Sequence, residues 1–394
     1  MFHHPQKKSK FTFRLIENFQ DLRAENYHGD VLYAQCDFLK YSSLIHSQVK
    51  HVVVEASEGN EVLGNFYFQI MPFKGSELKS YIPQGENCLF NKTLEAIVDL
   101  ALERVNWKLA VLGNVFVTGD NGQFWRNKNL ASEIKWEILE DVCTFLGKQT
   151  LADAFLISDL READLTGHDY MIDRSFRFFE VEPDLIFDID SSWESFDDYL
   201  ASVVSKYRVR TKKVLKKSQE LVVKDLSIDD IENQEELIYS LYKNVMDSVA
   251  FKLAEVGPDY FKSFKQAFPN NFFVRGLYLE DKMVGMISFF EDDSFLLMNF
   301  IGLDYSLNRE YCIYQRILYD SIAQGIQRRK KHIHFGRTAT EIKTSVGAKP
   351  VKAFSLLKHN SKITNKAIQP LTTYLKPERF EVRKPFRDKV QVAS

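Results

Sequence analysis

One short motif occurs twice in this chain, 221 residues apart, and this repeat limits the available folds more than any other feature. The first copy, Val62–Phe68, reads VLGNFYF, and the second, Met283–Phe289, reads MVGMISF. Each follows an apolar strand and a polar turn. Strand, tight turn and a second strand with an early glycine are typical of a β-hairpin with a bulge or close backbone approach at the glycine. Two such hairpins predict two similar domains rather than a short-period repeat.

Length and composition agree with two domains. The chain has 394 residues, enough for two domains of about 190 residues each. Its net charge of −2 gives no overall attraction to nucleic acid or membrane, so polyanion binding requires a local patch. The four cysteines are widely spaced, and the polar N-terminus lacks the apolar core of a signal peptide. We therefore expect a cytoplasmic protein without a transmembrane segment.

The order of apolar segments predicts an α+β fold. In the first half we expect strands at 11–16, 51–73, 109–117 and 154–157, apolar pieces at 176–181 and 184–189, and helices at 91–104 and 130–147. In the second half we expect helices at 233–247, 257–267 and 308–330 and strands at 272–280, 283–290, 294–302, 332–335 and 353–358. This order predicts mixed, mostly antiparallel sheets flanked by helices. The predicted domains are 1–190 and 191–376, followed by a loosely ordered tail, 377–394.

A sharp change of charge marks the seam between the halves. Residues 178–205 include eight acidic side chains and no Lys or Arg, whereas seven of the twelve residues at 206–217 are basic. Helical spacing of apolar residues across the change predicts one long amphipathic helix. The basic segment is either a solvated helix face, the usual role of a charge run, or a phosphate-binding surface. Arg208 and Arg210 are the better phosphate ligands because a guanidinium binds bidentately.

The second half contains a run of short motifs: NREYCIYQRILY at 308–319, IHFGRT at 333–338, then Glu341-Ile342-Lys343 and Gly347-Ala348. With the repeated hairpin and the basic segment KYRVR at 206–210, this run resembles the FemAB-like tandem acyltransferases of the GNAT superfamily over residues 10–360. The resemblance implies two GNAT-like domains. It also implies transfer of an acyl or aminoacyl group to an amine, with acyl-CoA or aminoacyl-tRNA as the co-substrate that donates it.

The chain departs from the GNAT pattern at one motif. The pyrophosphate loop of that superfamily is a Gln/Arg-x-x-Gly-x-Gly/Ala sequence before a helix, where backbone N–H groups hold phosphates. No Gln or Arg here is followed by Gly at the third position. Acetyl-CoA bound in the usual way is therefore not expected. Loss of the loop agrees with the FemAB-like branch, whose resemblance implies donors such as aminoacyl-tRNA.

Two basic residues near a helix start are candidate ligands for an anionic donor or substrate group. Arg337 and Lys343 flank the predicted N-terminus of a helix that follows a buried strand. Thr338 and Glu341 fit a capping box, and Gly347 is expected to end that helix in the left-handed conformation. His334, on the preceding strand, is more simply a structural histidine.

Catalytic candidates cluster where the helix at 308 begins. Acyl transfer to an amine needs a proton acceptor and a donor for the developing oxyanion. Asp304 or Glu310 is the candidate base, with Tyr311 and Tyr314 as candidate donors and Asn308 as a donor- or substrate-binding residue. The plain alternative is an N-capping asparagine followed by aromatic packing. Without paired cysteines or a P-loop, we expect no metal and no covalently bound cofactor.

Three classes of function remain open. The first is acyl transfer by direct attack of a neutral amine, with the better-kept site in the second domain. The second is a non-catalytic ligand-binding protein on a degenerate tandem GNAT scaffold. The third, nucleic-acid binding through residues 206–217, is disfavoured by the net charge near zero.

Overall fold

The computed structural model describes residues 10–27, 32–75, 103, 105–119, 122–149, 151–249, 252–368, 377 and 380–387. Apart from Glu103, the helix expected at 91–104 lies outside these residues. The chain divides into two compact units. Unit 1 is Met1–Val181 with Ala353–Lys376, and unit 2 is Glu182–Lys352 with Pro377–Ser394. In the ranges described, no helix is both long and apolar enough to span a membrane.

Unit 1 is a mixed sheet with helices. Its strand order is β1 (Thr12–Ile16), β2 (Lys50–Glu58), β3 (Glu61–Lys74), β4 (Asn106–Leu112), β6 (Ala154–Leu160) and β13 (Lys349–His359). Neighbours are antiparallel except β4 and β6, which are parallel. Strand β5 (Gln123–Trp125) pairs with β3. The helices are α1 (Cys36–Ile45), α3 (Ser132–Lys148), α4 (Asp169–Asp173) and α13 (Lys362–Ala367), with 3-10 turns at Phe19–Asp21, Ala24–Asn26, Leu32–Ala34 and Glu162–Leu165.

Unit 2 repeats this topology. Its strand order is β8 (Leu221–Asp225), β9 (Phe272–Leu279), β10 (Lys282–Glu291), β11 (Phe295–Leu303), β12 (His332–His334) and β7 (Arg177–Asp188). Only β11 and β12 are parallel. The helices are α5 (Phe196–Ser202), α6 (Ser205–Lys217), α7 (Ile228–Asn233), α8 (Glu235–Ser248), α9 (Tyr260–Ala267), α10 (Tyr305–Tyr311), α11 (Ile313–Gln327) and α12 (Thr340–Ser345).

One strand in each unit comes from the other half of the sequence. Strand β7 follows β6 in the chain, yet it pairs with β12 in unit 2. Strand β13 follows β12, yet it pairs with β6 in unit 1. The division into 1–190 and 191–376 therefore differs from the compact units, because a strand at the end of each half completes the other sheet. Such an exchange leaves no local trace in the sequence.

The repeated hairpin is confirmed in detail. In unit 1, Ala56 pairs with Gly64 and Ser57 with Val62, so the residue before the glycine is bulged out of the ladder. In unit 2, Leu277 pairs with Gly285 and Tyr278 with Met283, which places the bulge at the same point. The glycines allow close approach. A Cβ on Gly285 would lie 2.7 Å from Cγ2 of Ile313 in α11. The two hairpins therefore share the bulge by register as well as by sequence, whereas a Cβ on Gly64 would lie 3.2 Å from Phe124 and Trp125 of β5 instead.

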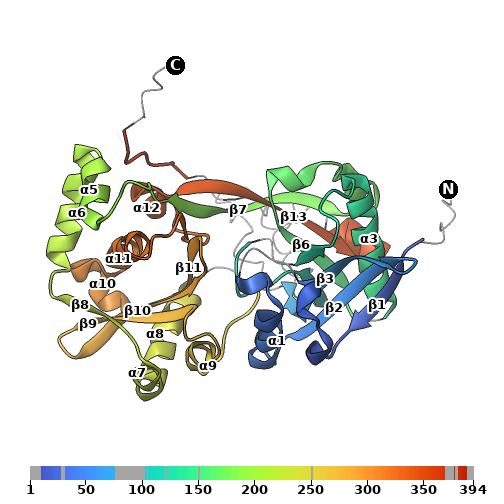
Figure 1. Cartoon of the computed structure of the whole chain (residues 1–394), viewed down its shortest axis with the longest axis horizontal. Helices are drawn as coiled ribbons and strands as arrows, with labels where there is room; N and C mark the ends of the chain where they lie inside the picture. The colour runs from blue at the N-terminus through green and yellow to red at the C-terminus, as the bar shows by residue number, and fades with distance from the viewer. Residues whose placement is uncertain are drawn as a thin grey trace, which may run out of the picture. The chain divides into compact units, whose positions relative to one another are not determined.

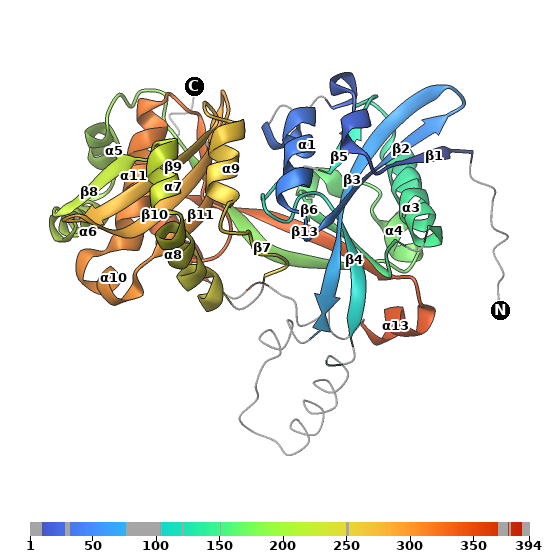
Figure 2. The same ribbon diagram turned by 90° about the horizontal axis from the view of Figure 1, so that it is seen from below.

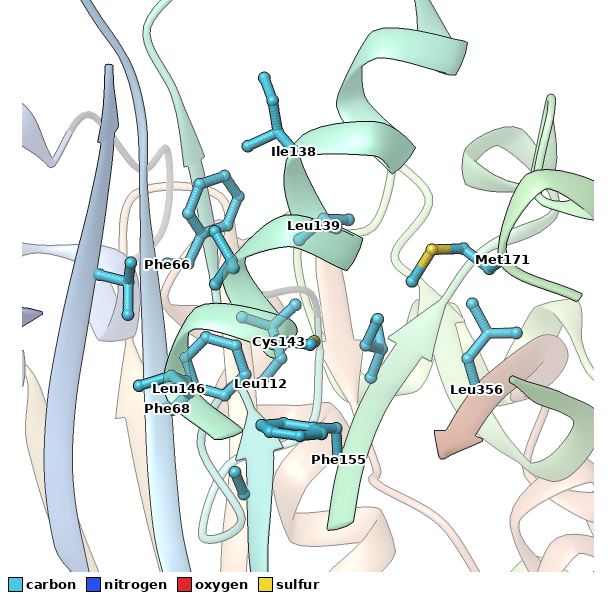
Figure 3. Close-up of a cluster of buried hydrophobic side chains, with 14 of the residues drawn as sticks. Phe66, Phe68, Leu112, Ile138, Leu139, Cys143, Leu146, Phe155, Met171 and Leu356 are labelled. Carbon is cyan, nitrogen blue, oxygen red and sulfur yellow. The ribbon is translucent and has the colours of Figure 1, made fainter. Parts of the chain in front are cut away.

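Each sheet has helices packed on its apolar face. In unit 1, the face of β3 with Phe66 and Phe68 packs against Leu139, Cys143 and Leu146 of α3 (Figure 3). In unit 2, α11 lies on one side of β9–β11, and α7, α8 and α9 lie on the other (Figures 1 and 2). Burial of these large side chains is the main stabilising term, about 1.5–3 kcal/mol for each fully buried aliphatic or aromatic residue.

Two predicted helices are each broken in the structure. The long helix expected across the charge change is two helices, α5 and α6. At the break, Val203 forms a bridge with Phe386, and the N–H of Val204 donates to the carbonyl of Pro385 (2.8 Å). The helix expected at 308–330 is α10 and α11, because Cys312 between them is left-handed (φ 51°).

The structure differs from two other expectations about the chain path, the second of them only over the described part of the tail. The apolar pieces on either side of Pro183 form one strand, β7. The pairing of β7 with β12 covers only Ile186–Asp188, so Pro183 lies outside that ladder. The described part of the tail, 377 and 380–387, is packed rather than loose. The ring of Phe386 lies against Phe187, Trp193 and Tyr199 in unit 2, which anchors the tail by apolar burial.

Candidate functional site

The parallel strands β11 and β12 of unit 2 are paired over a short stretch only. Their ladder runs from Phe295–His332 to Leu297–His334. Strand β12 ends there, whereas β11 continues to Leu303. At about 3.3 Å per residue, β11 extends about 20 Å beyond the last pair. Ligands of open sheets bind at the carboxyl ends of parallel strands, where the connections diverge. The segments that follow β12 and β11 are therefore the places to look for a site.

The loop after β12 has an unusual backbone. Gly336, Thr338 and Ala339 all have positive φ (66°, 65° and 49°). Two of the three carry a Cβ, which costs about 1–2 kcal/mol each in this conformation. Such strain persists only where the surrounding structure holds it, and it is concentrated at functional sites.

The structure contradicts the predicted start of α12 and confirms its predicted end. The capping box of Thr338 and Glu341 was wrong: α12 begins at Thr340, and its N-cap is Ala339, which has no side-chain cap. The Glu341 carboxylate instead accepts from the guanidinium of Arg383 (3.0 Å) in the tail. At the other end, Gly347 has φ 113°, which confirms the expected positive-φ termination.

Three charged side chains meet beside this loop. Asp184 on β7 and Lys343 on α12 are buried, with 4% and 5% exposure. The Arg337 Nε donates to Asp184 Oδ1 at 3.0 Å, and the Lys343 Nζ donates to the backbone carbonyl of Arg337 at 2.5 Å. Asp184 thus gives Arg337 a resident anion. The three residues come from a strand, a loop and a helix, and they define what we call the β12 cluster (Asp184, Arg337 and Lys343).

Burial changes the titration of both cations in the β12 cluster. Removal from water lowers the pKa of Lys343 to about 7, although the nearby Asp184 charge acts in the opposite direction. Burial also lowers the pKa of Arg337 to about 10. An amine with a pKa near neutrality exchanges a proton readily at physiological pH. This is the property required of a general base that later acts as an acid.

Asp304, the candidate base of the second group, already has partners. It is the N-cap of α10, where it accepts from the N–H (3.1 Å) and hydroxyl (2.5 Å) of Ser306, and it pairs with Lys282 at 3.3 Å. The hydrogen bond from Ser306 is the main cause of its lowered pKa, and Lys282 adds to it. A carboxylate with a lowered pKa is a weak proton acceptor. Glu310, the other candidate base, is exposed on α10.

The amide of Asn308 caps the helix after Cys312. Its Oδ1 accepts from the N–H of Tyr314 at 2.9 Å, so one N–H of the first turn of α11 is satisfied within the chain. Burial raises the pKa of the Tyr314 hydroxyl, which stays protonated. Tyr311, the last residue of α10, is half-buried, and the charge of Glu310 raises its pKa. The structure thus gives Asn308 a structural role and leaves the catalytic roles of both tyrosines as predictions.

The two arginines predicted to bind phosphate differ. The Nε and Nη2 of Arg208 both donate to the carbonyl of Val203 (3.2 and 2.9 Å), which satisfies the end of α5. Arg210 is exposed, with its guanidinium 5.8 Å from the ring centre of Tyr207. Arg210 therefore remains available to a ligand, whereas the fork of Arg208 is occupied by backbone carbonyls.

Sequence reasoning missed Asp184. It lies 153 residues before Arg337, on the exchanged strand β7, and nothing in the sequence near Pro183 links it to the loop after β12. His334 is half-buried, and its ring stacks on Phe295 with centroids 5.0 Å apart, in agreement with a structural role. Among the described residues, no group of three His, Cys, Asp or Glu side chains is placed to hold a metal ion.

Unit 1 has a buried polar network between β2, β3 and the loop after β4. The hydroxyl of Tyr67 lies 2.7 Å from His51 Nδ1 and accepts from Gln69 Nε2 at 2.9 Å. The Oε1 of Gln69 accepts from the N–H of Val115 at 2.7 Å. His46 stacks on Phe116 with centroids 3.6 Å apart. In the repeat, Ser288 of β10 in unit 2 corresponds to Tyr67, and the apolar Phe290 corresponds to Gln69. The two units therefore differ in chemistry despite their common topology.

Comparison with known proteins agrees with this architecture. No family model and no curated protein matches the chain. Among solved structures it is similar to FemX, with a TM-score of 0.54 and 11% identity over 90% of this chain and 100% of that chain. It is also similar to a tandem GNAT protein from the clavulanic acid biosynthesis pathway, with a TM-score of 0.53 and 8% identity over 89% and 99% of the two chains. The chain therefore has a tandem GNAT-like α+β fold, as its sequence predicted.

Proposed function

We propose that this protein transfers an acyl or aminoacyl group from an activated donor to an amine, beside β11 and β12 of unit 2. The observation that carries the proposal is Lys343, a buried amine whose pKa is lowered to about 7, at the carboxyl end of β12. It lies in a fold shared with FemX and with a tandem GNAT protein. A buried, perturbed amine beside a strained loop is a good candidate for a working residue.

The reaction proceeds by direct attack. The neutral amine nitrogen bonds to the carbonyl carbon of a thioester or ester, and the carbonyl electron pair moves to oxygen. Neutral Lys343 accepts a proton from the attacking nitrogen. When the tetrahedral intermediate collapses, the C–S or C–O bond breaks, and Lys343 returns the proton to the leaving sulfur or oxygen. Positioning of the two substrates supplies much of the remaining acceleration.

Other residues have supporting roles in this proposal. The backbone carbonyl of Arg337 accepts from the Lys343 amine, and Asp184 fixes the Arg337 guanidinium through the 3.0 Å bond. The protonated hydroxyl of Tyr314 is a candidate donor to the oxyanion. Asp304 is a weaker candidate base than Lys343, because its carboxylate is held by Ser306 and Lys282.

The donor is acyl-CoA or aminoacyl-tRNA, and one feature favours the second. In a pyrophosphate loop the helix N-terminus offers free N–H groups to phosphates. Here α10 precedes α11, and Oδ1 of Asn308 already accepts a hydrogen bond from the N–H of Tyr314. This arrangement agrees with the absence of the glycine-rich motif and supports a donor held in another way.

The test is a transfer assay with a panel of acyl-CoA and aminoacyl-tRNA donors and simple amine acceptors. We expect one donor class to be consumed with formation of an amide. The variant Lys343→Met keeps the side-chain length and removes the amine, and it should reduce kcat roughly a hundredfold or more. Lys330→Met is the matched control, because Lys330 is a half-buried lysine of unit 2 with a side chain 9% exposed, paired with Glu291 at 2.8 Å. It should leave kcat of the folded protein unchanged.

Two results would contradict the proposal. Absence of turnover with every donor, together with retained ligand binding, would support the non-catalytic alternative. Equal losses of kcat in Lys343→Met and Lys330→Met would show that the amine of Lys343 has no special role.

A further inference from the structure

Helix α6 presents a strongly basic face to solvent. Its buried side is formed by Thr211, Val214 and Ser218, which pack toward the core of unit 2. The opposite side is exposed and carries six cations: Lys206, Arg210, Lys212, Lys213, Lys216 and Lys217. We call this surface the α6 face. Val209, at 65% exposure, lies in the middle of it at helical spacing.

The cations of the α6 face are not neutralised by the protein. Within the part of the chain that the structure describes, none of the six forms an ion pair or donates a hydrogen bond. Lys206 and Arg210 only approach the ring of Tyr207, at 5.7 and 5.8 Å. Of the exposed carboxylates that precede this helix, Asp198 caps α5 by accepting from the N–H of Ser195. The structure therefore does not show the six cations neutralising the acidic segment that precedes them.

The geometry of the α6 face favours an extended anionic surface. Thirteen residues at 1.5 Å per residue give a helix about 20 Å long. The charge on this face stands out against a chain with a net charge of −2. Clusters of four to eight Lys or Arg on one helix are attracted to anionic lipid headgroups within a Debye length of the surface.

We infer that the α6 face docks unit 2 onto an anionic lipid bilayer. Five of the six cations are lysines, whose compact charges suit a diffuse field of headgroup phosphates, whereas arginine forks are favoured for recognition of nucleic-acid phosphates. The α6 face has no aromatic side chain at its centre on which bases stack. A bilayer offers the exposed side chain of Val209 an apolar contact at the acyl boundary, whereas a sugar–phosphate backbone offers none.

The docking is peripheral and reversible. One exposed valine buries too little apolar area to insert the helix, so the attraction is mainly electrostatic and is screened by salt. This inference does not depend on acyl transfer. It places the protein at a membrane surface whether or not unit 2 turns over a donor.

The experiment measures binding of the full chain to vesicles of phosphatidylcholine alone and of phosphatidylcholine with 30% phosphatidylglycerol (about a third, to give a strongly anionic surface). The test variant is Lys212→Glu/Lys213→Glu/Lys216→Glu. The matched control, Lys128→Glu/Lys148→Glu/Lys366→Glu, makes the same change of charge at exposed lysines of unit 1. We expect binding to the anionic vesicles only, weakened on the order of a hundredfold or more by the α6 changes and much less by the control. High salt should abolish it, and Val209→Ala should weaken it a few-fold.

Three outcomes would overturn the inference. They are no binding to the anionic vesicles, equal losses in the two triple variants, and binding of an RNA duplex in place of vesicles. The last would assign the α6 face to nucleic acid. Because the substituted lysines are exposed, a folded far-UV circular dichroism spectrum distinguishes lost docking from lost structure.

Discussion

Two buried histidines make the stability of unit 1 depend on pH. Burial lowers the pKa of His51 to about 4 and that of His46 to about 3. In the unfolded chain both titrate near 6.5. Because the folded pKa values are lower, the unfolded state binds more protons as the pH falls below 6.5. The stability of the neutral pair is therefore complete above that pH and is lost progressively toward pH 4 and 3.

We predict that the free energy of unfolding of unit 1 is about 2–4 kcal/mol lower at pH 5 than at pH 7. Urea titrations that follow unit 1 measure it. His51→Gln keeps a hydrogen-bonding group next to Tyr67 and removes one titration, so about half of the pH dependence should disappear. A free energy that is unchanged between the two pH values would refute this assignment.

At the scale of elements, the two hairpins offer a reciprocal test. The first turn residue of each has positive φ: Gly59 at 60° in unit 1, and Glu280 at 55° in unit 2. The two positions correspond in the repeat. Only the glycine adopts this conformation without a Cβ penalty. Glu280→Gly should therefore raise stability by up to about 1 kcal/mol, and Gly59→Glu should lower it by about as much. Thermal unfolding of the two variants checks both signs; the same sign in both would contradict the shared turn geometry.

The tail is a structural strap on α12. Phe386 occupies the space beside Gly347, where a Cβ would lie 2.3 Å from its ring, and the N–H of Arg383 donates to Thr344 Oγ1 (3.1 Å). We predict that Phe386→Ala destabilises unit 2 by about 2–4 kcal/mol, because it leaves a cavity among aromatic rings. Arg387→Ala, an exposed neighbour, should have little effect. Chemical denaturation of the two variants measures the difference, and equal effects would show that the tail is not anchored by this ring.

At the scale of the whole molecule, unit 1 depends on a strand from the end of the chain. Leu356 of β13 lies in the core with Phe155 and Met171 (Figure 3). We predict that Leu356→Ala costs unit 1 about 2–5 kcal/mol. Hydrogen exchange should then increase at the amides of β6, far from position 356 in the sequence. Exchange that increases in unit 2 alone would argue against the pairing of β13 with β6.

The sequence predicted what local patterns determine. The bulged hairpins followed from Gly64 and Gly285 next to polar turns, and Arg337 and Lys343 were identified as site candidates. The sequence did not reveal the exchange of β7 and β13, because strand partners are set by packing between distant segments. Asp184 was missed for that reason. Pro183 suggested a break between two apolar pieces. The strand β7 continues through it, because the missing N–H of a proline matters only where a ladder bond requires it.

The central claim is that Lys343 moves the proton in acyl transfer, and the pH–rate profile tests it most directly. The assay should use an acceptor amine of low pKa, so that the acceptor stays neutral over the whole pH range of the profile. With a pKa of about 7, Lys343 must be neutral to act as base, so kcat/KM should rise with pH and level off above about 7. In Lys343→Met the rate should fall roughly a hundredfold and lose this rise. A Lys343→Met profile that keeps both the rate and the same rise would contradict the account.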